Sequence, residues 1–314
     1  MIKKISTTLF TTSVLACSAL MVPQVGSATN LADYSMPVSN PVYNGDARNV
    51  TMVRPIMIFH SLPDDIKTSI GDVPLGGDVT GMAVQLSYAF NERLSLVAVK
   101  DGYFDLDADN TLNDENGWAD VAAGLQYSFI YEPKNNFIMT GRLVYEAPVG
   151  DDDIFQGNGD GNLAPAILFL KGWDKLQFSG TVGLVLPVDT DEENTLLYDS
   201  WNLSYAVTDI IRPLVELNHF HVLNSGDRNM SQVAGGTQDD LVAAITTFNG
   251  VDIINLGGEH NDDNEDLVTM ALGSRFRINK WLDLGAAYEI PLTNDDESLM
   301  KNRFTVDAVF TMAF

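Results

Sequence analysis

The end of the chain, from Arg303 to Phe314, alternates between two kinds of side chain. Successive side chains of an extended strand point to opposite faces. One face would carry mainly large apolar groups, namely Phe304, Val306, Ala308, Phe310, Met312 and Phe314; the other would carry Thr305, Asp307, Val309, Thr311 and Ala313. The segment is long enough to cross a bilayer as a β-strand, although a soluble sandwich also uses such alternation.

Similar segments recur along the whole chain, and their connections alternate in length. Strands are predicted at 50–60, 80–90, 94–103, 118–131, 137–147, 163–171, 176–187, 197–207, 211–223, 267–278, 282–290 and 303–314. Short turns follow every second strand, and long acidic connections follow the others, the longest running from Asn224 to Asp266. Short turns at one end and long connections at the other are typical of outer-membrane barrels, and a soluble sandwich has no need for such an arrangement. Residues 50–314 are therefore predicted to form an all-β, antiparallel up-and-down transmembrane β-barrel of about 12 strands, with long acidic outer loops, in the bacterial outer membrane.

The charge balance excludes one class of partner. The 314 residues include 43 acidic and 18 basic ones, a formal charge of −25. Nucleic-acid binding needs a surface rich in lysine and arginine, so no nucleic-acid partner is expected. Beyond the N-terminus, no stretch is apolar over the ~20 residues that a membrane helix needs.

The first residues resemble a secretory leader. Two early lysines precede an apolar stretch and the small residues Gly26-Ser27-Ala28, which predicts a signal peptide over 1–28 with cleavage after Ala28. The alternative is lipoprotein processing before Cys17, which would cut the apolar stretch short. Residues 29–49 are polar and rich in Asn, Ser and Pro, and they predict a loose N-terminal segment.

The polar strand faces predict what lines the lumen. If these faces point inward, both signs of charge enter the barrel, and the candidates for a constriction are Arg142, Glu146, Arg275, Arg277, Asp283, Glu289 and Asp307. Two alternatives remain open: a filled barrel held by ion pairs, or a polar conduit for a small solute. The short turns predict the strand register, with Arg277 opposite Asp283, Ile278 opposite Leu282, and Asn202 opposite Glu216.

Two groups of residues are candidates for chemistry. Asp105, Asp107 and Asp109 resemble a calcium loop but lack the glycine and glutamate of an EF-hand, so a solvated acidic tip is expected, with loop-bound divalent cations as the alternative. Acidic loops could also bridge through cations to lipopolysaccharide. His219 and His221 share the predicted lipid-facing side of one strand; interfacial histidines are expected, with metal binding or lipid hydrolysis with Ser225 as alternatives. No other cofactor is predicted.

Four stretches carry a resemblance to a known group: Pro74 to Leu106, Phe155 to Gly161, Pro213 to His221 and Gly285 to Thr293. They resemble uncharacterised bacterial outer-membrane β-barrels, labelled putative transporters and similar to the barrel proteins associated with meta-pathway aromatic degradation. The resemblance brings no catalytic residues. Phe314 with Phe310 and Met312 is similar to the signal that the barrel-assembly machinery recognises.

The predicted function is that of a non-enzymatic, passive channel or facilitator for small, aromatic or apolar solutes. The other partners expected are outer-membrane lipids and lipopolysaccharide. The alternatives are a barrel-borne lipid hydrolase and a sealed structural barrel whose loops bind cations or surfaces.

Overall fold

The computed structural model describes residues 31–68, 71–157, 159–190, 193–226, 266–293 and 299–312. The predicted signal peptide, most of the longest connection and Phe314 lie outside these residues. Within them, no helix is both long enough and apolar enough to cross a membrane. The helical elements described are three short 3-10 turns: η1 (Leu31–Asp33), η2 (Pro133–Asn135) and η3 (Asp152–Ile154).

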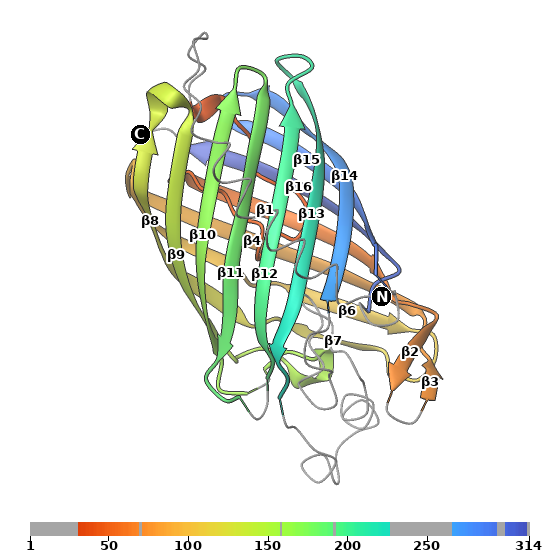
Figure 1. Ribbon diagram of the computed structural model, residues 1–314. Coiled ribbons are helices and arrows are strands. Elements are labelled where there is room, and N and C mark those ends of the chain that lie inside the picture. The colour runs from red at the N-terminus through yellow and green to blue at the C-terminus, as the bar shows by residue number, and fades with distance from the viewer. Residues whose placement is uncertain are drawn as a thin grey trace, which may run out of the picture.

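A closed ring of antiparallel strands forms the body of the molecule (Figure 1). Each strand pairs with its neighbours, and β1 pairs with both β16 and β4, which closes the sheet. The predicted 12-stranded antiparallel barrel is therefore confirmed. The strands of the ring are β1 (Thr51–Ser61), β4 (Gly77–Asn91), β5 (Leu94–Lys100), β8 (Val121–Glu132), β9 (Phe137–Ala147), β10 (Asn162–Trp173), β11 (Leu176–Pro187), β12 (Thr195–Tyr205), β13 (Ile211–Asn224), β14 (Asp266–Asn279), β15 (Leu282–Pro291) and β16 (Asn302–Met312).

Two hairpin-like extensions stand at the rim that carries the long connections. They consist of β2 (Asp65–Thr68) with β3 (Gly71–Pro74), and of β6 (Tyr103–Ala108) with β7 (Glu115–Trp118). The prediction of one strand over 94–103 followed by a loop was wrong here. Gly102, with φ of 136°, separates β5 from β6, and both of these strands pair with β4. The new strand forms because Phe104 and Leu106 bury their side chains in an apolar cluster.

Strand register follows the predicted phase at two of three positions. Arg277 pairs with Asp283 through an ion pair of 3.0 Å, and Asn202 stands opposite Glu216. The pairing of Ile278 with Leu282 was wrong, because Leu282 lies opposite Asn279 across an irregularity in the ladder. The Asn279 side chain accepts a hydrogen bond from the Trp281 backbone N–H, and this tightens the turn by one residue.

The outer wall of the barrel is apolar. On β4, the outward side chains alternate with inward ones as predicted, and large groups such as Tyr88 and Phe90 are more than half exposed. On β16, Phe304 and Phe310 face outward, whereas Thr305 and Asp307 are buried within. A closed barrel with such a wall satisfies its own backbone and presents mainly apolar side chains to lipid.

Candidate functional site: the occupied lumen

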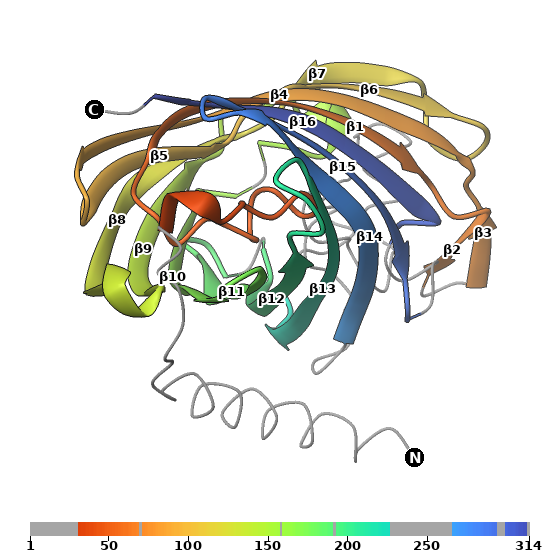
Figure 2. The same cartoon turned by 90° about the horizontal axis from the view of Figure 1, so that it is seen from above.

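The luminal segment, residues 31–49, runs inside the ring of strands (Figure 2). A loose N-terminal segment was expected, but Tyr34, Val38 and Asn44 are almost completely buried. The segment contains no strand, so its backbone polar groups need other partners. Side chains of the barrel wall provide them, and this mutual arrangement is the central feature of the lumen.

Wall side chains bind the backbone of the luminal segment from Met36 to Ser39, and we call this set of contacts the central grip. The guanidinium of Arg275 donates to the carbonyl oxygens of Met36 and Pro37, and Arg54 donates to those of Pro37 and Val38 at 3.1 Å. On the other side, the Glu216 carboxylate accepts the backbone N–H groups of Val38 at 2.9 Å and Ser39 at 2.7 Å. Positive groups therefore hold the carbonyls, and one negative group holds two successive amides.

Asp307 balances the charge of the two arginines. It accepts hydrogen bonds from both Arg54 and Arg275, and all three side chains are almost completely buried. Together with Glu216, they form a group of two positive and two negative charges in a low-dielectric interior. Asp307 pairs with both arginines, and Glu216 accepts hydrogen bonds from two amides and from Asn202, so these contacts offset part of the cost of desolvation.

Polar side chains continue this support along the rest of the segment. Gln177 exchanges two hydrogen bonds with the backbone of Ser35, at 2.8 and 2.6 Å. Further along, the donors are Gln85 to the carbonyl of Pro41, Arg142 to Val42, Thr140 to Ala47, and Gln126 to Asp46 and Arg48. Burial disfavours the charge of Arg48, but the carboxylates of Asp46, Asp283 and Asp33 together outweigh this effect and raise the pKa of Arg48 above its ordinary value.

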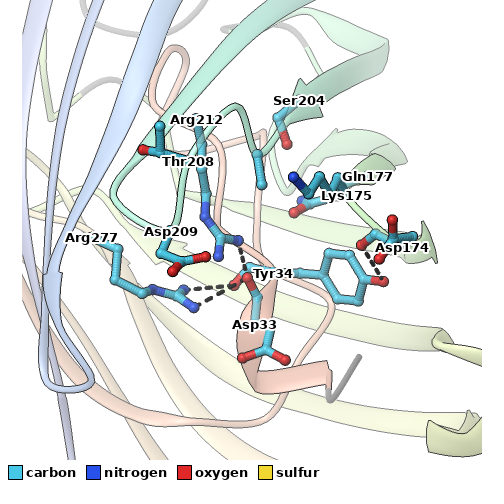
Figure 3. Close-up of a pocket in the computed structure, with 11 residues that line it drawn as sticks. Asp33, Tyr34, Asp174, Lys175, Gln177, Ser204, Thr208, Asp209, Arg212 and Arg277 are labelled. Atoms are coloured by element: carbon cyan, nitrogen blue, oxygen red, sulfur yellow. Dashed lines mark hydrogen bonds between the residues drawn. The ribbon is translucent and has the colours of Figure 1, made fainter. Parts of the chain in front are cut away.

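At the short-turn rim, the segment leaves open space on its flanks. One cavity of about 380 Å³ is lined by Tyr34, Arg212 and Arg277 among others, and a second of about 560 Å³ lies by Arg48 and Trp281. Arg277 donates to the carbonyl oxygens of Ala32, Asp33 and Tyr34, so it anchors the start of the segment (Figure 3). The lumen is thus open to this side up to the luminal segment.

The ring of Tyr34 occupies a place that only a glycine leaves free. A Cβ atom on Gly172 would lie 1.9 Å from Cζ of Tyr34. We expect Gly172→Val to expel Tyr34 and to expose the start of the segment to added protease, with at least a several-fold faster cleavage near residue 34. Gly141→Val is the matched control, because its Cβ would meet only Phe129, at 3.9 Å. Equal cleavage of the two variants in detergent would contradict the role of Gly172.

Toward the long connections, a large part of the inner wall is apolar, while the ion pairs Glu146–Lys100 and Glu289–Arg303 lie beside it. The expectation of a polar inward face was therefore wrong at these apolar positions. The buried inward side chains there come from several strands: Ile56, Ile58, Val79, Phe104, Val185, Leu196, Tyr198, Phe220, Val222 and Leu267. Tyr43 of the luminal segment packs against this lining, with its ring centroid 4.7 Å from that of Tyr198 and 5.4 Å from that of Phe220.

The seven side chains predicted for a constriction all lie on the inner side of the wall, in separate groups. Arg275 and Asp307 belong to the central grip, Arg277 and Asp283 to the short-turn rim, and Arg142 to the segment contact at Val42. Glu146 pairs with Lys100 at 2.6 Å, and Glu289 pairs with Arg303 at 2.8 Å.

The sequence analysis did not assign Arg54 and Arg303 to the lining of the lumen. Their position in the alternation of β1 and β16 is the signal that could have shown it, since Arg54 shares its face with Ile56, Ile58 and His60.

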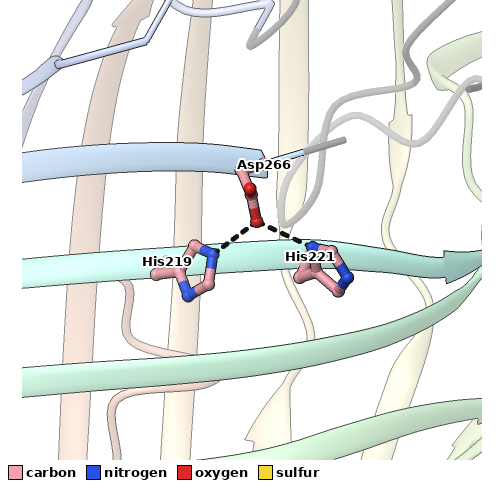
Figure 4. Close-up of side chains that lie close together, drawn as sticks. All are labelled: His219, His221 and Asp266. Carbon is pink, nitrogen blue, oxygen red and sulfur yellow. Dashed lines mark hydrogen bonds and ion pairs between the residues drawn. The ribbon is translucent and has the colours of Figure 1, made fainter. Parts of the chain in front are cut away.

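The two groups of candidate cation-binding residues lie in different surroundings. Asp105, Asp107 and Asp109 lie exposed along and just after β6. His219 and His221 face outward on β13 as predicted, and both contact Asp266 of β14 (Figure 4). Ser225 follows the end of β13 and is partly buried.

Comparisons with known proteins were made for sequence and for structure. No family model matches the chain, and no curated protein matches it. The COG4313 outer membrane channel from Pseudomonas putida F1 superposes with a TM-score of 0.59 at 12% identity, covering 92% of this chain and 100% of that one. The NanC porin, with a TM-score of 0.49 at 8% identity, covers 82% of this chain and 100% of its own. At these identities the likeness concerns the fold. By that fold and by the apolar chemistry of its wall, the chain is an outer-membrane β-barrel.

Proposed function

We propose that the protein is a passive channel for small aromatic or apolar solutes, gated by the luminal segment, residues 31–49. The observation that carries the proposal is the way this segment is held. Its contacts with the wall are hydrogen bonds and packing between side chains and an irregular backbone, without strand pairing. Such contacts can be exchanged for water one by one, whereas a strand of the ring cannot leave without opening the barrel.

Unsatisfied polar atoms support a lumen that takes up water. Both polar atoms of the Asn44 side chain are buried without a partner, as are Asn40 Oδ1 and Asn202 Oδ1. Buried polar groups in folded proteins nearly always have a partner, either protein or ordered water. These groups therefore favour hydration of the space between segment and wall, along the path that a solute would take.

The apolar part of the inner wall supports the solute class. The Tyr43 ring sits against Tyr198 and Phe220 within the apolar lining. An aromatic solute offers the same kind of surface, and it could replace this ring when the segment moves. Against these apolar side chains, a sugar would instead leave hydroxyl groups without partners.

Flux into liposomes tests the proposal. We expect purified protein to admit a small phenol or benzoate faster than a sugar of similar size. Phe220→Asp should reduce this preference, because a carboxylate beside Tyr198 disfavours apolar contact. Phe276→Asp is the matched control for a charge on a neighbouring strand, since Phe276 points outward. Absence of any flux and of any single-channel current from folded protein would contradict a channel function.

A further inference from the structure

On the outer wall, near the rim with the long connections, four polar side chains gather where lipid-facing strands are otherwise apolar. His219 and His221 lie on β13, Asp199 on β12 and Asp266 on β14. Both histidine side chains are 15% exposed, and that of Asp266 is 31% exposed. Polar groups on the lipid-facing side of a barrel are unfavourable, and such groups point to a function when they occur together.

The side-chain nitrogen and oxygen atoms of three of these residues lie close enough together to bind one metal ion. Asp266 Oδ1 lies 2.9 Å from His219 Nε2 and 2.7 Å from His221 Nδ1. One ligand atom from each of these three residues lies within 4.8 Å of the others, the only such group among the described residues. Two histidines separated by one residue on a strand point the same way, and the adjacent strand brings a carboxylate to the same side.

The second ring nitrogen of His219 has its own partner. Nδ1 lies 2.8 Å from Asp199 Oδ2, so both nitrogens of one imidazole face carboxylate oxygens. A neutral imidazole carries a single N–H and cannot donate from both nitrogens. If Nδ1–H donates to Asp199, Nε2 keeps a lone pair, and a bound cation can stand between it and Asp266. A carboxylate that orients a ligating histidine in this way is the usual outer partner at zinc sites.

We propose that His219, His221 and Asp266 form a transition-metal site on the outer wall, suited to Zn²⁺, with Asp199 as a positioning residue. Two imidazole nitrogens and one carboxylate oxygen match the donor preferences of zinc and leave a fourth position for water. Calcium and magnesium prefer oxygen ligands alone and fit this donor set poorly. The ion would join β13 to β14 at the foot of the connection between them.

Zinc titration of the folded full chain in detergent tests this site, with a competing chelator to set the free concentration. We expect one tight equivalent in the wild-type protein, and a loss of affinity of at least ~100-fold in His219→Ala and in His221→Ala. Asp199→Asn should weaken binding about 10- to 100-fold, as expected for an outer partner. Leu217→Ala, on the same strand and face, should bind as the wild type does. The acidic connections remain in every variant, so any cation that they bind contributes equally to each titration.

Cobalt provides a readout of geometry that does not depend on function. Co²⁺ in the site should give the visible absorption of a nitrogen-ligated, four-coordinate ion, and each single histidine variant should lose it. Heat-modified migration in gel electrophoresis shows which variants are folded barrels, and only those are compared. Equal zinc affinity in the wild type and in both folded histidine variants would overturn the proposal. So would an absorption spectrum unchanged by either substitution.

Discussion

Glu216→Ala raises the conductance of the barrel by a factor on the order of 100 or more. The substitution removes two charge-assisted hydrogen bonds from the backbone of Val38 and Ser39, each of which contributes roughly 1.5–3 kcal/mol. It also leaves Arg54 and Arg275 with only Asp307 as a counter-charge. Both effects weaken the hold on the luminal segment far more than on the ring. Planar-bilayer recordings of the variant and the wild type make the measurement.

The matched control is Glu289→Ala. Glu289 is equally buried in the lumen and bonds Arg303, Asn218 and Thr269, but no bond described joins it to the luminal segment. We expect this variant to lose stability while its conductance stays near that of the wild type. Equal conductance of both glutamate variants would show that the grip at Met36 to Ser39 does not control the lumen.

A reversible cross-link tests the same mechanism without removing a charge. Val38 packs with Ala271 in one apolar cluster, and residues 29–314 contain no cysteine. In Val38→Cys with Ala271→Cys, oxidation should tie the segment to β14 and stop flux, and a reducing agent should restore it. Val38→Cys alone should not respond to either treatment. Flux that persists in the fully cross-linked protein would mean that solutes pass without movement of the segment.

Asp307→Asn destabilises the barrel by about 3–5 kcal/mol, the cost typical of removing one partner from a buried ion pair. The neutral side chain leaves Arg54 and Arg275 facing one another in the interior, where each is almost fully buried. Urea unfolding in detergent micelles, followed by gel mobility, measures the loss in the free energy of unfolding. The cost falls on the ring as well as on the segment, because Asp307 belongs to β16 and its partners to β1 and β14.

Asp283→Asn is the control for this effect. Asp283 also pairs with an arginine across two strands, but the side chains of the pair are 19% and 16% exposed at the short-turn rim. Water can solvate Arg277 when its partner is lost, so the expected cost is about 1 kcal/mol or less. A similar loss in both variants would mean that burial does not set the strength of the central group.

The alternation of side chains in the sequence was sufficient to predict the wall of the barrel. Every strand has one face toward lipid and one face toward the lumen, and this imposes a period of two on its sequence. A slip by one residue would put charges into lipid. The predicted limits of β9 and β11 match the structure residue for residue, and the pair Asn202–Glu216 follows from turn length. The pair Arg277–Asp283 was also predicted, but it forms through a register shift beside a turn that is one residue shorter than expected. Local irregularities, such as Gly102 between β5 and β6, were beyond this argument because a break in pairing leaves the alternation almost unchanged.

The contents of the lumen were decided by tertiary structure. Residues 31–49 have no period, because their backbone partners are side chains from distant strands; Val38 and Glu216, for example, are 178 residues apart. Only closure of the ring brings Arg54, Glu216, Arg275 and Asp307 around one short segment. Pairing of β13 with β14, across the longest connection, brings Asp266 to the histidines. The sequence by itself determined the barrel, since each strand reports its own two environments. The tertiary structure decided what occupies that barrel and where a metal would bind, since both depend on contacts between residues far apart in the chain.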